Sequence, residues 1–177
     1  PRGQPFAVTA RELAARGLLD HPAWLVAYAR VAGADARVHA GEYELPPGTT
    51  PRSLLRLFES GAVVQHPVTI VEGWTFRDLR RALEREPHLD QTLAGRDDAA
   101  VMEALGETGL HPEGLFFPDT YLYGKGTTDL EILRQARARM RRELDTAWSA
   151  RAADLPLQSP YEALILASIV EKETALA

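Results

Sequence analysis

The sequence predicts an α+β fold, and three observations support that class. Several segments carry apolar residues at the three-to-four-residue spacing of a helix. Others, notably residues 63–71, are short and rich in β-branched residues, which is typical of strands. A Gly-x-Thr-x-Arg-x-Leu pattern occurs at residues 48–54 and again at 73–79, and it predicts a glycine turn followed by a capped helix at each place.

The composition is that of an ordinary globular protein, with 177 residues, 45% hydrophobic and 25% charged. The formal net charge of −5 argues against a nucleic-acid partner, and the absence of Cys excludes disulfides and thiolate chemistry. The sequence holds neither a signal peptide nor an apolar stretch of bilayer-spanning length. Because it begins at Pro1 and stops inside a predicted helix, we expect a fragment of a longer chain, one from which an N-terminal membrane anchor can be missing.

The first third of the chain is predicted to alternate strands and helices. Glycines, prolines and Thr caps mark where each element begins or ends. In order, the predicted elements are a strand at 4–8, a helix from Thr9 to Arg16, a helix from His21 to Ala32, a strand at 38–45 and a helix from Thr50 that Gly61 ends.

The middle of the chain begins with a predicted strand at 63–71. A glycine turn, a helix to about Glu86, a loop at 87–98 and a short helix at 99–105 follow. Residues 106–126 are predicted to be irregular and aromatic, and such a loop either packs on a core or lines a cleft.

A long helix is predicted from a capping box, Thr128 with Glu131, to about Ala153. It carries an arginine-rich face. We expect this face to be solvated, with a grip on an acidic ligand as the alternative. The arginines are Arg134, Arg137, Arg139, Arg141 and Arg142.

The last predicted helix spans residues 159–174. Ser159 suits the N-cap, Pro160 the first helical position, and Glu162 completes a capping box. Between residues 163 and 170 only Ser168 is polar, so we expect most of the circumference of this helix to be buried.

Two carboxylates, Glu171 and Glu173, follow on the same helix. A carboxylate on a buried helix must be paired or must hold a proton, and a proton held near neutral pH is what a general acid needs. Glu171 shares its face with Ala167 and Ser168, which leave room for a ligand, so the pattern favours Glu171 over Glu173 as the acid. The residues alone leave open whether the helix surfaces here and both carboxylates are solvated.

Other chemistry is absent from the sequence. The five His are scattered without metal-ligand spacing, and there is no P-loop, G-x-S-x-G or G-x-G-x-x-G motif, so neither a metal nor a cofactor is predicted. What remains is carboxylates and aromatic residues, the usual equipment of carbohydrate sites. Besides the acid, the candidates for contact with substrate are Glu113, Asp119, Tyr121, Ser168 and Glu173; for the first three, anchoring of the loop is the alternative.

Four stretches together resemble one family. They are AGEYEL at 40–45 with PGTT at 47–50, VTIVEGWT at 68–75, EGLFFPDTY at 113–121 and LASIVEKET at 166–174. In this order they resemble the endolytic murein transglycosylases of the YceG-like family over nearly the whole chain, and the last two motifs are the specific ones. Val71 departs from the pattern, since the family usually has Pro there.

The resemblance implies a LysM-like subdomain at residues 1–62 and, at 63–177, part of an α+β catalytic domain that continues further in the family. It implies a bacterial inner-membrane protein with one N-terminal span and a periplasmic body. The implied activity is cleavage of the MurNAc–GlcNAc bond of nascent peptidoglycan strands, without a cofactor, leaving a 1,6-anhydroMurNAc end. The family's catalytic Glu falls on Glu171, and cell-wall synthases are implied as partners.

A lytic transglycosylase works with one carboxyl group, which first gives and then takes a proton. That role requires a raised pKa, which burial beside Ile169 and Val170 is expected to supply. Three alternatives stay open at this point: a non-catalytic peptidoglycan-binding module, a scaffold for cell-wall synthases, and a hydrolase.

Overall fold

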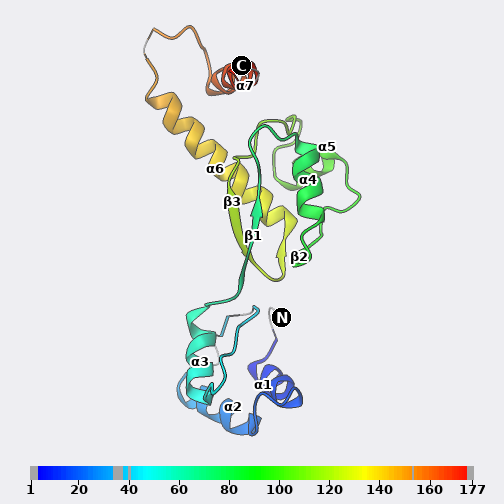
Figure 1. Cartoon of the computed structure of the whole chain (residues 1–177), viewed down its shortest axis with the longest axis vertical. Coiled ribbons are helices and arrows are strands. Elements are labelled where there is room, and N and C mark those ends of the chain that lie inside the picture. The colour runs from blue at the N-terminus through cyan, green and yellow to red at the C-terminus, as the bar shows by residue number, and fades with distance from the viewer. Residues whose placement is uncertain (1–3, 34–37, 40, 153, 175–177) are drawn as a thin grey trace. The chain divides into compact units, whose positions relative to one another are not determined.

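The computed structural model describes residues 4–33, 38–39, 41–152 and 154–174, and it confirms the α+β class (Figure 1). The chain divides into two compact units. The first comprises residues 1–66 with 124–126, and the second comprises residues 67–123 with 127–177. None of the described helices combines the length and hydrophobicity that crossing a bilayer requires.

The first unit contains three helices, α1 (Phe6–Ala15), α2 (Pro22–Val31) and α3 (Pro51–Ser60). They enclose a small core of their own. Its buried residues are Phe6, Ala10, Leu25, Ala29, Leu54, Leu55 and Phe58.

The two strands predicted in this unit are wrong. Residues 6–8 form the first turn of α1 instead, because Phe6 and Ala10 lie one helical turn apart and both face the core. The helix therefore begins at Phe6 and not at the predicted cap, Thr9. The described residues of 38–45 are irregular; they make single backbone bonds, such as Val64 N–H to Glu42 O at 2.8 Å, where a strand would need a ladder. Whether this unit is LysM-like stays a prediction.

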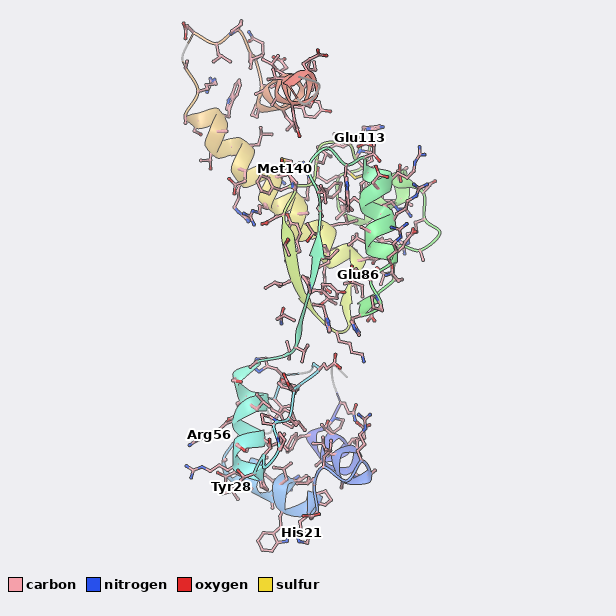
Figure 2. All side chains as sticks on the ribbon, viewed as in Figure 1. His21, Tyr28, Arg56, Glu86, Glu113 and Met140 are labelled. Atoms are coloured by element: carbon pink, nitrogen blue, oxygen red, sulfur yellow. The ribbon has the colours of Figure 1, made fainter. Side chains whose placement is uncertain are left out.

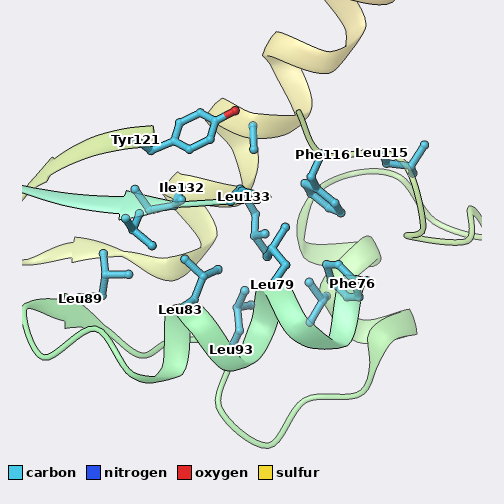
Figure 3. Close-up of a cluster of buried hydrophobic side chains, with 14 of the residues drawn as sticks. Phe76, Leu79, Leu83, Leu89, Leu93, Leu115, Phe116, Tyr121, Ile132 and Leu133 are labelled. Atoms are coloured by element: carbon cyan, nitrogen blue, oxygen red, sulfur yellow. The ribbon is translucent and has the colours of Figure 1, made fainter. Parts of the chain in front are cut away.

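The second unit is built around α4 (Phe76–Glu84) and α6 (Asp129–Ser149). Between them in sequence lie α5 (Asp98–Ala104) and three short strands, and α7 (Pro160–Thr174) follows α6. Strand β1 (Gln65–Thr69) pairs with β3 (Thr120–Gly124), while β2 (Leu89–Asp90) pairs in parallel with β4 (Thr127–Thr128). Apolar side chains from α4, α6 and the strands fill the core between them (Figure 3).

A buried carboxylate ties the start of α6 to this core. Asp129 is 3% exposed; its Oδ1 accepts from the Thr92 N–H at 3.0 Å and its Oδ2 from the Leu93 N–H at 2.9 Å. These bonds satisfy the charge that burial would otherwise leave without partners. The predicted capping box between Thr128 and Glu131 is confirmed just beside it.

The repeated turn-and-cap pattern is also confirmed. Thr50 and Thr75 each cap a helix in a reciprocal box, with Ser53 and Asp78 respectively. The Thr75 hydrogen bonds lower the pKa of the Asp78 carboxyl. The glycine before each cap has a positive φ, which a residue with a Cβ adopts only at a cost.

Candidate active site

Helix α7 carries the predicted catalytic residue, and Ser159 caps its N-terminus as the sequence predicts. Ser159 Oγ accepts from the Glu162 N–H at 3.2 Å. The Glu162 carboxylate accepts from the Gln158 N–H at 2.7 Å, one residue before the cap, whereas the predicted capping box uses the N–H of Ser159 itself.

The predicted burial of α7 is wrong for the described chain. Four of its large apolar side chains are about half exposed, because no described element covers the face that carries them. They are Ile165 at 44%, Leu166 at 47%, Ile169 at 54% and Val170 at 53%.

One contact docks α7 onto the aromatic loop. Leu164 is partly buried, and a Cβ built at Gly114 would lie 3.6 Å from its Cδ2. Gly114 has a φ of +75°, so a residue with a side chain would be strained there. The motif at 113–121 therefore lies against the helix that carries the motif at 166–174.

Glu171 follows Leu164 by seven residues, which places both on the same face of α7. Glu171 itself is exposed, so the burial expected around it is not supplied by the described residues. Ser168 is exposed and donates to the Ile165 carbonyl of its own helix at 2.7 Å. Glu173 is exposed on a different face.

Glu113 lies beside the N-terminal end of α4 (Figure 2). Its Oε2 accepts from the Phe76 N–H at 2.9 Å, and Phe76 is the first residue of the helix. The carboxylate therefore satisfies one of the N–H groups that a helix start leaves unpaired.

Asp119 joins three parts of the second unit. Its Oδ2 pairs with the Arg139 guanidinium on α6, and its backbone carbonyl accepts from the Ile70 N–H at 2.9 Å. The same guanidinium lies 5.0 Å from the centre of the Phe117 ring. These contacts make Asp119 an anchor of the loop.

Tyr121 is only 6% exposed, and its hydroxyl donates to the Phe117 carbonyl at 2.8 Å. Burial raises the pKa of Tyr121 to about 12. A specific contact thus supports loop anchoring by each of Glu113, Asp119 and Tyr121. Their contact with substrate stays a prediction.

The prediction that the arginine-rich face of α6 is solvated is confirmed for Arg134, Arg141 and Arg142, which are exposed, but not for Arg137 and Arg139, which are partly buried. Arg137 has a side chain only 16% exposed, and its Nε lies 3.0 Å from Glu107 Oε1. Arg134 donates to the Ala104 carbonyl at 3.2 Å. Arg141 also lies near Glu107, with its Nη1 at 3.9 Å from Oε1. The sequence gives no signal for these pairs, because Glu107 lies far from both Arg137 and Arg141 in sequence.

The second unit thus defines an α+β protein in which a carboxylate-bearing helix lies against an aromatic loop. The chain belongs to the YceG-like family, whose model matches residues 1–177. Membership of this family is consistent with a murein transglycosylase.

Among solved structures, the chain is similar to a yceG-like protein from Listeria monocytogenes. The identity is 22%, the match covers 84% of this chain and 55% of that one, and the TM-score is 0.37. The chain therefore spans about half the length of that protein. No curated protein matches the chain.

Proposed function

We propose that the protein is an endolytic peptidoglycan lytic transglycosylase in which Glu171 is the single acid and base. The observation that carries this proposal is the family match over residues 1–177, which includes the specific motif around Glu171. The packing of Leu164 against Gly114 supports it further, since it brings the other specific motif to the same face of α7.

In the proposed reaction, Glu171 donates its proton to the glycosidic oxygen between MurNAc and GlcNAc as that bond breaks. The resulting carboxylate then takes the proton from the MurNAc C6 hydroxyl, whose oxygen bonds to C1. No water is consumed, and Glu171 regains its proton. Such acid–base assistance is typically worth about 10² to 10⁴ in rate.

Because Glu171 is exposed, the proposal requires that something else exclude water from this residue during the reaction. A general acid works best where water is excluded, and the described residues leave the α7 face open. We therefore expect the glycan strand, together with parts of the longer family members that these residues do not include, to cover Glu171 during the reaction. The proposed location is the periplasmic side of a bacterial inner membrane, near the cell-wall synthases.

The substitution Glu171→Gln tests the assignment in a full-length soluble protein. It keeps the side-chain shape and removes the proton donor, so release of anhydro-muropeptides from uncrosslinked glycan strands should fall by at least about 10². Mass spectrometry of the products measures this loss, and it separates a lyase from a hydrolase because a hydrolysed end is one water heavier. Glu103→Gln, an exposed position on α5, is the matched control. Anhydro products at the wild-type rate from Glu171→Gln would refute the role of Glu171.

The same exposure favours one second candidate, a non-catalytic peptidoglycan-binding or scaffold module. In that case Glu171→Gln would retain both binding to glycan strands and the cellular phenotype, and the wild-type protein would yield no anhydro ends.

A further inference from the structure

Helix α2 of the first unit carries large apolar side chains on two of its sides, although only one side faces the core. Leu25 is 1% exposed and Ala29 fully buried. Away from that side, Trp24 is 78% exposed, Tyr28 43% and Val31 90% (Tyr28 is labelled in Figure 2). At about 100° per residue these three side chains lie within about 60° of one another, so they form one stripe. We call Trp24, Tyr28 and Val31 the α2 stripe.

The exposure of this stripe is unusual for a helix that packs on a hydrophobic core. Exposed apolar residues are normal when scattered, but a contiguous set on one face marks an interaction site. Leu18, in the turn that leads into α2, is 54% exposed and adds an aliphatic side chain to the same helical hairpin.

The other flank of α2 is basic. An open hollow of about 440 Å³ lies between α1 and α2, and its floor is made of small apolar residues such as Ala7, Ala23 and Ala27. Arg11 and Arg30 also line it, and none of its lining residues is acidic. The hollow therefore suits an anionic group that sits beside apolar material.

Charge is divided unevenly between the units. Residues 1–66 and 124–126 hold eight basic and six acidic residues, so the negative net charge of the chain, −5, lies in the second unit. An anionic surface would thus be attracted to the first unit and repelled by the second.

We propose that the α2 stripe and the Arg11–Arg30 hollow bind the surface of an anionic lipid membrane. Trp and Tyr are the residues that favour the membrane–water interface, and arginines extend their charged ends to headgroup phosphates while their stems stay in apolar surroundings. Val31 and Leu18 add aliphatic surface that suits acyl chains. This proposal is independent of the proposed enzymatic activity.

Two other occupants fit the observations less well. A sugar needs hydroxyl-binding polar side chains beside the aromatic rings, and the α2 stripe offers only the Tyr28 hydroxyl. A stable protein interface uses roughly 20 to 30 residues a side, far more than this narrow stripe presents.

The experiment uses the fluorescence of Trp24 in the 177-residue chain to report membrane binding. A background with Trp74→Phe and Trp148→Phe leaves Trp24 as the one tryptophan, whose emission can be excited apart from that of the tyrosines. On addition of phosphatidylglycerol vesicles, Trp24 emission should shift to shorter wavelength, and brominated acyl chains should quench it. Phosphatidylcholine vesicles should give a weaker effect. In the otherwise wild-type chain, Trp24→Ala should weaken co-sedimentation with the vesicles about tenfold.

The charge contribution is tested by Arg11→Gln combined with Arg30→Gln, which should reduce phosphatidylglycerol binding to the phosphatidylcholine level. The matched control is Leu122→Ser, which removes a 60% exposed apolar side chain from β3 in the second unit and should leave vesicle binding unchanged. Unchanged Trp24 emission at saturating vesicles would overturn the proposal. So would an emission shift with chitooligosaccharide alone, or a dimer that Trp24→Ala dissociates while vesicles are not bound.

Discussion

Tyr121 illustrates how one side chain can carry the chemistry of a binding site and yet be part of the fold. Its hydroxyl is the type of group that binds sugars, and the sequence places it in an aromatic loop. In the structure this hydroxyl is used inside the protein, where it donates to Phe117 O. A sequence shows which groups a residue offers, but the partner of each group depends on contacts that only the fold determines.

The buried Tyr121 predicts a specific alkaline weakness. Burial raises its pKa in the folded state to about 12, from an ordinary value of 10.0. The folded protein therefore holds this proton more tightly than the unfolded chain does. The protonated Tyr121 therefore makes its full contribution to the free energy of unfolding below about pH 10. This contribution is lost between about pH 10 and 12, by up to about 1.4 kcal/mol per pH unit.

Urea unfolding at several pH values between about 8 and 11 measures this loss. Tyr121→Phe should cost about 1 kcal/mol near neutral pH through the lost hydrogen bond, and should also flatten the alkaline decline. Tyr123→Phe is the matched comparison, because burial and the bond to Glu86 also raise the pKa of Tyr123. A decline of equal steepness in wild type and both variants would contradict the prediction.

At the scale of elements, three predicted threonine caps are confirmed, whereas the helix predicted from Thr9 begins at Phe6 without a side-chain cap. The caps at Thr50, Thr75 and Thr128 are local, since the donor and acceptor lie three residues apart in sequence. The strand at 4–8 was mispredicted because the spacing of Phe6 and Ala10 fits a helix once α1 starts at Phe6. The prediction that α7 is buried is wrong for another reason. Apolar composition predicts that a helix packs against other elements, but not that the described residues include those elements.

The start of α4 depends on a residue far away in sequence, and this predicts a structural effect of Glu113. Glu113→Ala leaves the Phe76 N–H without its protein partner and should lower the free energy of unfolding by about 1 kcal/mol. Glu113→Gln keeps an oxygen at the same place and should recover much of that loss. Thermal unfolding of both variants checks this. If neither variant changed the melting temperature, Glu113 would not anchor the loop, and the substrate-contact prediction would gain support.

At the scale of the whole molecule, each unit has its own hydrophobic core. Phe6, Leu25 and Phe58 belong to one, while Leu79, Ile132 and Leu133 belong to the other. The order of the predicted elements indicates that the chain divides into two units. It does not indicate that residues 124–126 belong with the first unit, because that assignment depends on contacts between residues distant in sequence.

Separate cores predict separate unfolding. The first unit is small, so it should unfold at a lower urea concentration than the second, giving two transitions. Leu25→Ala leaves a cavity in the first core and should cost about 2 to 5 kcal/mol there, shifting only the first transition. Ile132→Ala, equally buried in the second core, should shift only the second. In a Trp24→Phe background, circular dichroism with the fluorescence of Trp74 and Trp148, both in the second unit, distinguishes the two transitions. A single transition shifted by both variants would show that the two cores unfold as one cooperative structure, and would overturn the division of stability that the separate cores imply.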